Sequence, residues 1–138
     1  MQDEESAVPA IKLVLVRRAE FDIADAIAWL SRTAGEDSAL NFMTRLDDEI
    51  AVLRESVGEE LAEFGRHRAR PHEAGSVYFA RPIYRHVMQT VKRRARRSSA
   101  GVWHIYYEVR VETDKERSAL VVHSIQHGAS EPYTVPTN

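Results

Sequence analysis

Apolar positions change their spacing along this chain, and each change predicts a different element of secondary structure. The stretch "IKLVLV" (residues 11–16) is short, apolar and β-branched, which predicts a strand that is buried on much of its surface. The next apolar residues recur at helical spacing: Ile23, Ala26, Ile27 and Leu30. Because Gly35 is a natural stop, we expect a helix over about 19–33.

The most regular pattern in the chain follows immediately. Its apolar stripe consists of Ala39, Phe42, Met43, Leu46, Ile50, Leu53 and Val57. This stripe predicts a second helix over about 38–57. Only a few residues separate the two helices, which indicates an antiparallel helix hairpin. Residues 58–76 read as a helical turn mixed with a loop that contains Gly and Pro.

Three extended segments make up the rest of the chain. Residues 77–91 look extended, with Pro82 splitting the segment or marking a sheet edge. Residues 102–111 alternate, and the apolar set is Trp103, Ile105, Tyr107, Val109 and Val111. The opposite set is Val102, His104, Tyr106, Glu108 and Arg110. Such alternation predicts a strand with one face on the core and one polar or functional face. Residues 119–128 form the last predicted strand.

The predicted fold is therefore α+β, in the order β-α-α-β-β-β. An antiparallel helix hairpin on one face of a small, mostly antiparallel sheet is the simplest layered arrangement of these elements. A chain of 138 residues suits one domain, which we place at 11–130. Residues 1–10 and 131–138 are expected to be a loose N-terminal tail and an irregular C-terminal tail.

Composition excludes several classes of function. The chain has no cysteine, which rules out disulfides and thiolate chemistry. Its N-terminus lacks a signal-peptide pattern, and no apolar run approaches the roughly 18 residues that a membrane span needs. We therefore expect a soluble cytoplasmic protein. No Gly-rich phosphate loop, GxSxG or HExxH motif is present, and no cofactor is predicted.

Charge is distributed very unevenly along the chain. Residues 1–65 carry six Lys/Arg and fifteen Asp/Glu, whereas residues 66–97 carry ten Lys/Arg and one acid. The middle of the chain thus favours an anionic partner, although the overall net charge is only −2. That partner is a nucleic acid, an acidic protein, or the acidic first third of the same fold.

Five basic residues crowd the connection between two predicted strands: Lys92, Arg93, Arg94, Arg96 and Arg97. Arginine binds phosphate in a bidentate manner, and the neighbouring Trp103, Tyr106 and Tyr107 offer stacking surfaces for bases. These five residues are our predicted nucleic-acid contacts. The alternative is a solvated hairpin tip.

The polar face of residues 102–110 is the best candidate for chemistry. His104, Tyr106, Glu108 and Arg110 can supply a proton acceptor, a proton donor and a cation for a phosphate, with Arg85 as a cross-strand neighbour. RNA cleavage through the 2′-hydroxyl requires no more than this and no metal. The alternative is a solvated face with a Glu108–Arg110 pair.

A metal site is not predicted. His123 and His127 lie four residues apart, a spacing that puts both on one face of a strand. A metal pair is conceivable from that spacing, but no acidic third ligand lies nearby in the sequence.

Taken together, these patterns resemble the RelE/ParE superfamily of toxins from bacterial type II toxin–antitoxin (plasmid stabilisation) modules. The likeness lies in "AEFDIADAIAWL" and "ALNFMTRLDDEIAVL", which are similar to the two helices of that family. It also lies in "VWHIYYEV" and "LVVHSIQH", which are similar to its paired strands. The match covers about residues 11–130, and it is carried by the order and spacing of these pieces.

The resemblance implies a toxin that a cognate antitoxin neutralises, with one of two modes of action. A RelE-like toxin cuts mRNA on the ribosome with residues of the sheet and a Tyr or His near the end of the last strand. A ParE-like toxin arrests growth by binding DNA gyrase and needs no catalytic residues. The helix hairpin is closer to the ParE-like branch. If the chain is RNA-cleaving, the expected catalytic residues are Arg85, His104, Tyr106, Arg110 and His127.

The sequence also departs from that family. Residues 58–100 are longer than usual, and the first half of the chain is unusually acidic. A non-toxic RNA-binding module that uses the basic run at 92–97 is therefore a further hypothesis. A homodimer also fits, because a small sheet leaves edges to cover.

Overall fold

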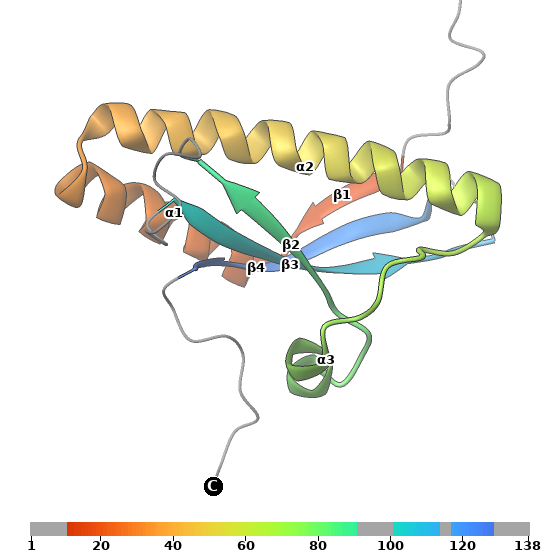
Figure 1. Cartoon of the computed structure of the whole chain (residues 1–138). Helices are drawn as coiled ribbons and strands as arrows, with labels where there is room; N and C mark the ends of the chain where they lie inside the picture. Colours follow the sequence, from red (N-terminus) through yellow and green to blue (C-terminus); the bar gives the residue numbers. More distant parts are fainter. Residues whose placement is uncertain (1–10, 91–100, 114–116, 129–138) are drawn as a thin grey trace, which may run out of the picture.

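The computed structural model describes residues 11–90, 101–113 and 117–128. Its elements follow one another as β1 (Lys12–Leu15), α1 (Arg17–Thr33), α2 (Glu36–Phe64), α3 (Glu73–Phe79), β2 (Tyr84–Gln89), β3 (Val102–Arg110) and β4 (Ala119–His127) (Figure 1). The predicted α+β class and the order β-α-α-β-β-β are confirmed, with the short helix α3 added before β2. The predicted tails, 1–10 and 131–138, lie outside the described residues.

The four strands form one sheet in the order β1-β4-β3-β2. β2, β3 and β4 are antiparallel neighbours, whereas β1 runs parallel to β4. The expectation that residues 11–16 are buried on much of their surface is wrong, since Leu13 and Val14 are 38% and 37% exposed. The reason is that β1 has a neighbouring strand on one side only.

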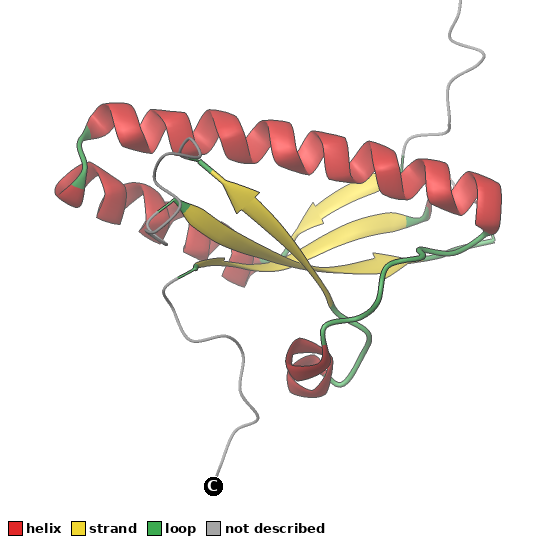
Figure 2. Cartoon of the chain, viewed as in Figure 1, coloured by secondary structure: helices red, strands yellow, loops and turns green. Residues whose placement is uncertain are grey.

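Helices α1 and α2 form the predicted hairpin and cover one face of the sheet (Figure 2). The core beneath them contains Phe42 and Leu46 of α2, Ala26 of α1, and Trp103 and Ile105 of β3. A second cluster continues the stripe of α2 with Leu53, Val57 and Leu61 against Tyr107 and Leu120 of the sheet. These buried side chains fix which face of each strand is turned away from the hairpin.

Helix α2 is longer than the sequence predicted. The predicted end near residue 57 is wrong, because the helix continues through the buried Gly58 to Phe64. Leu61 extends the apolar stripe by a further turn and lies buried on the sheet, which outweighs the low helix propensity of one glycine. Gly65 then ends the helix with a positive φ of 76°.

The predicted extended segment at 77–91 is only partly correct. Residues 73–79 form α3, and the strand is limited to Tyr84–Gln89. Pro82 separates the two elements, since it suits the entry to a strand better than its interior. Phe79 packs with Ile83 and Tyr106, so α3 lies on the face of the sheet opposite the helix hairpin.

Side chains of α2 cover the free edge of β2. The Nε of Arg45 donates to the carbonyl of Gln89 at 3.1 Å, and Asn41 donates to the carbonyl of Thr90 at 3.2 Å. His86 Nε2 lies 2.6 Å from the carboxylate of Glu49. The hydrogen bonds from Arg45 and Asn41 occupy backbone carbonyls at this end of the β2 edge.

A β-bulge interrupts the pairing of β3 and β4. Tyr106 pairs with Ser124, but Tyr107 pairs with Val122, so His123 is the extra residue of β4. Asp22 of α1 supports the bulge, since its carboxylate accepts hydrogen bonds from the Ser124 hydroxyl at 2.7 Å and the Ile125 amide at 3.0 Å. The bulge reverses the alternation of side chains along β4.

Candidate active site on the sheet

The face of the sheet turned away from the helix hairpin brings together three of the predicted catalytic residues. Arg85 of β2 lies directly opposite Tyr106 of β3 in the antiparallel register. His104 lies two residues before Tyr106 on the same strand, so it shares this face. The rings of His104 and Tyr106 have centroids 6.2 Å apart. The site therefore lies on two neighbouring cross-strand pairs of β2 and β3, Arg85–Tyr106 and Val87–His104.

Tyr106 is not on an open polar face, contrary to the sequence prediction. Its side chain is fully buried, because His72 and Phe79 of the α3 segment pack against it. Burial raises the pKa of the Tyr106 hydroxyl, and the interaction with the positively charged Arg85 opposes that rise. Tyr106 therefore stays protonated at neutral pH, and its buried side chain packs beside Arg85 rather than meeting a substrate itself.

His104 has the properties of a proton acceptor. Its burial lowers the pKa of the imidazole, and the nearby charges of Arg85, His72 and His127 lower it further. The ring is thus neutral at pH 7 and keeps one nitrogen lone pair free for a proton. Arg85 is exposed beside it, and its guanidinium is a fixed positive charge.

His72 is a site residue that the sequence analysis missed. It precedes α3, and its Nδ1 accepts a hydrogen bond from the backbone amide of Gly75 at 3.1 Å. Its ring meets the ring of Tyr106 edge-on, with centroids 5.4 Å apart. Burial lowers the pKa of His72, and so does the charge of Arg85. Histidine is not among the favoured N-cap residues, so "RPHEAGS" offered only a weak signal.

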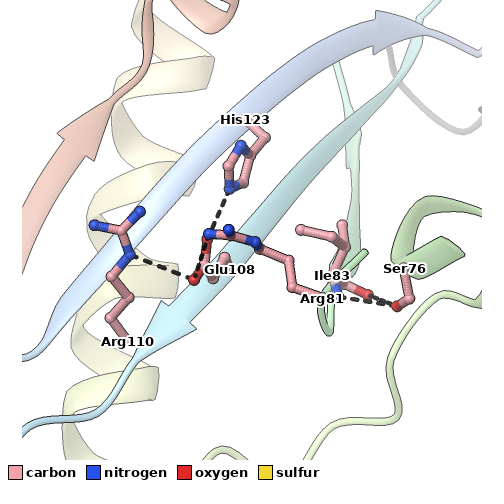
Figure 3. A network of polar contacts seen from close by, with 6 residues as sticks. All are labelled: Ser76, Arg81, Ile83, Glu108, Arg110 and His123. Atoms are coloured by element: carbon pink, nitrogen blue, oxygen red, sulfur yellow. Dashed lines mark hydrogen bonds and ion pairs between the residues drawn. The ribbon is translucent and has the colours of Figure 1, made fainter. Parts of the chain in front are cut away.

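Arg110 and Glu108 lie on the same face but in a separate polar network (Figure 3). Glu108 accepts from Arg110 at 3.3 Å, from Arg81 at 3.3 Å and from His123 at 2.9 Å. Burial raises the pKa of Glu108, but the hydrogen bonds from His123 and Arg81 and the charge of Arg110 outweigh it and lower the pKa. Arg110 therefore forms an ion pair with Glu108 while its side chain stays 51% exposed. This agrees with the alternative interpretation of this face, a Glu108–Arg110 pair on a solvated surface.

His127 faces the helix hairpin and not the other site residues. It lies opposite Trp103 in the register, and its ring centroid is 4.9 Å from that of Trp103 and 5.0 Å from that of Trp29. His127, which was expected to be catalytic in an RNA-cleaving protein, therefore does not lie on the face that carries Arg85 and His104, because the bulge shifts the alternation of β4. The same shift puts His123 and His127 on opposite faces of the sheet. Their spacing of four residues had suggested that they share one face.

No cluster of metal-ligating residues is found among residues 11–90, 101–113 and 117–128. The same part of the chain holds no helix that is long and apolar enough to cross a membrane.

The predicted nucleic-acid contacts, Lys92, Arg93, Arg94, Arg96 and Arg97, lie outside the described residues. The two ends of their segment are defined. Thr90 donates its amide hydrogen to the carbonyl of Gly101 at 2.7 Å, directly beside the Gln89–Val102 pair that ends the β2–β3 ladder. His104 lies two residues from this point, which is about 7 Å along a strand. Thr90 and Gly101, which flank the basic segment in the chain, thus lie close to the candidate site.

The arrangement combines a neutral imidazole, an exposed guanidinium opposite a buried tyrosine, and a second imidazole with a defined tautomer. A neutral imidazole can accept a proton from a hydroxyl group, and a guanidinium stabilises the negative charge that develops on a phosphate. These groups suit phosphodiester cleavage by an internal hydroxyl. Comparison of the chain with known protein families, curated proteins and solved structures found no match.

Proposed function

We propose that this protein is the toxin of a type II toxin–antitoxin pair, acts in the cytoplasm by cutting mRNA on the ribosome, and is neutralised by a cognate antitoxin. The order of elements fits the toxin fold that the sequence resembles. The observation that carries the cleavage mode is the pairing of Arg85 with Tyr106 beside a neutral His104 on one face of the sheet. This geometry favours the RelE-like mode over the ParE-like mode that the helix pattern suggested.

In the proposed reaction, His104 accepts the proton of a ribose 2′-hydroxyl. The 2′-oxygen attacks the adjacent phosphorus, and the bond from phosphorus to the 5′-oxygen breaks. Water supplies a proton to the leaving oxygen. Arg85 stabilises the extra negative charge on the phosphoryl oxygens as it forms. The products are a 2′,3′-cyclic phosphate and a 5′-hydroxyl end, with no metal and no covalent intermediate.

Induced expression in a bacterium without the antitoxin tests this function. Protein synthesis should stop first, and cleaved mRNA ends should accumulate. His104→Ala and Arg85→Gln should both relieve the arrest, whereas His86→Asn should not, because His86 faces Glu49 of α2. Arrest that survives both site variants would refute cleavage at this site.

A second candidate is inhibition of DNA gyrase by the helix hairpin. Large apolar side chains lie exposed on it: Phe21 of α1 is 68% exposed, and Leu40 and Val52 of α2 are 60% and 64% exposed. Under this mode, DNA synthesis should stop first, and a charge introduced at this position by Phe21→Glu should relieve the arrest. A lack of growth arrest together with salt-dependent RNA affinity would instead support the non-toxic RNA-binding module.

A further inference from the structure

His72 combines a fixed ring orientation with a donor, Nε2–H, that no described residue uses, and its pKa responds to the charge of Arg85. Its Nδ1 accepts from the Gly75 amide, so the neutral ring carries its hydrogen on Nε2. No described residue accepts a hydrogen bond from that Nε2. Protonating Nδ1 would break the contact with Gly75, so the cap itself favours the neutral tautomer that donates from Nε2.

The segment that holds His72 is tied firmly to the sheet. The amide of His72 donates to the carbonyl of Ile83 at 2.6 Å, and the amide of Ile83 donates to the Ser76 hydroxyl at 2.9 Å. Ile83 is fully buried and leads directly into β2. The backbone that sets the place of His72 is thus continuous with the strand that carries Arg85.

The far end of α3 has a second attachment. Arg81 reaches Glu108 of β3, which also accepts from His123, as Figure 3 shows. Phe79 stacks on His123 with ring centroids 4.7 Å apart. With both ends of α3 held, the ring of His72 loses little conformational freedom when it binds a ligand.

We propose that His72 is a further binding residue of this site, whose Nε2–H donates to a phosphodiester oxygen that Arg85 holds from the other side. A phosphodiester carries one negative charge and two unesterified oxygens, which suits one cation and one neutral donor. This role deepens the proposed function by assigning the ligand class to the α3 segment, which lies outside the four stretches that carry the resemblance. It rests on the proposed function only for the identity of the ligand as RNA.

The direct test needs no variant of the protein. The imidazole ¹⁵N and Hε2 signals of the full chain are followed by NMR while a 2′-O-methyl oligoribonucleotide, which cannot be cleaved, is added. The Hε2 signal of His72 should move downfield and exchange more slowly with water. The signals of His86, which bonds Glu49 near the β2 edge, should stay in place. An unmoved His72 signal under saturating probe would overturn the proposal.

His72→Asn supplies the matching affinity measurement. Asparagine is a favoured N-cap, so it preserves the contact to Gly75 while its shorter side chain withdraws the donor. The Kd for the probe should rise about five- to tenfold, the size of one neutral hydrogen bond. An unchanged Kd in a variant with unchanged thermal unfolding would contradict the role of His72.

The two proposals fail in different ways. If the probe binds through His72 but RNA with free 2′-hydroxyls is left intact, the phosphodiester site stands and cleavage fails. If RNA is cut while His72→Asn binds and cuts as well as the original chain, cleavage stands and this inference fails. In the expected case, His72→Asn raises KM for RNA and leaves kcat nearly unchanged, since the contact is made to the bound substrate.

Discussion

The carboxylate of Asp22 on α1 accepts a hydrogen bond from the backbone amide of Ile125 on β4 at 3.0 Å, just beyond the bulge and beyond Val122, the last residue of β4 that pairs with β1. The same oxygen accepts from the hydroxyl of the buried Ser124 at 2.7 Å. One helix side chain therefore satisfies two polar groups of the strand and holds the bulge that separates His123 from His127.

Asp22→Ala should destabilise the fold. Two partly buried donors would lose their acceptor, and each unsatisfied group costs about 1–3 kcal/mol. Urea unfolding should therefore show a loss of roughly 2–4 kcal/mol in the free energy of unfolding. Asp25→Ala on the same helix is the control, because Asp25 is exposed and should change stability by less than about 0.5 kcal/mol. Equal losses in the two variants would contradict the role of Asp22.

The contact between Glu60 and His67 should make stability depend on pH. His67 Nδ1 lies 2.6 Å from the Glu60 carboxylate, and His67 Nε2 lies 2.8 Å from the hydroxyl of Tyr107. Burial raises the pKa of Glu60, but hydrogen bonds from His67 and the Arg68 amide, with their charges, outweigh it and leave the pKa below its usual value of 4.5.

A carboxyl whose pKa is lower in the folded state stabilises the fold above its unfolded pKa, and this contribution disappears as pH falls through the folded pKa. Glu60→Gln should therefore lower the free energy of unfolding at pH 7 and make little difference near pH 3. Denaturant titrations at both pH values measure this, with the exposed Glu59→Gln as the control. A Glu60→Gln effect that is constant over this pH range would exclude the ionised contact.

Tyr106→Phe should separate catalysis from stability. Phenylalanine keeps the buried ring against His72 and Ile83, but it removes the hydroxyl whose pKa responds to Arg85. We expect the free energy of unfolding to change by no more than about 1 kcal/mol and kcat/KM for RNA to fall about tenfold, because the polar interaction with Arg85 is lost. Tyr106→Ala should instead cost about 3–5 kcal/mol, because it leaves a cavity. Full activity in Tyr106→Phe would show that the hydroxyl has no role in cleavage.

The pH profile of cleavage tests His104 as the proton acceptor. Activity should rise with pH as His104 loses its proton, and the midpoint should lie below the usual histidine pKa of 6.5. Burial lowers that pKa most, and the charge of Arg85 contributes. Arg85→Gln removes a positive charge that disfavours the protonated ring, so the midpoint of its residual activity should move to higher pH. A midpoint that does not respond to Arg85→Gln would argue for another base.

The alternation of residues 102–111 was sufficient to predict that His104 and Tyr106 share one face, and Arg85 was expected only as a cross-strand neighbour. A period of two is a property of the strand itself, and β3 keeps it from Val102 to Arg110. The place of His127 could not be predicted in this way. One extra residue at His123 reverses the face of everything beyond it, and the residues after it bond to a carboxylate about a hundred residues earlier in the chain.

The helix α3 and its packing on Tyr106 could not be predicted from the sequence either. Residues 73–79 are too few to show a helical stripe, and their aromatic content is equally typical of a strand. The burial of Tyr106 and the cap at His72 follow from where this short helix packs, which is a tertiary outcome. The end of α2 was missed for a related reason, since burial of Leu61 keeps the helix going beyond Gly58.

The central claim is that His104 and Arg85 cut RNA through its 2′-hydroxyl. Purified protein added to translating ribosomes, with the new mRNA ends mapped and their chemistry determined, tests it most directly. We predict that the original chain and His86→Asn both produce 2′,3′-cyclic phosphate and 5′-hydroxyl ends. His104→Ala should produce neither. Intact mRNA, or equal cutting by His104→Ala, would contradict it.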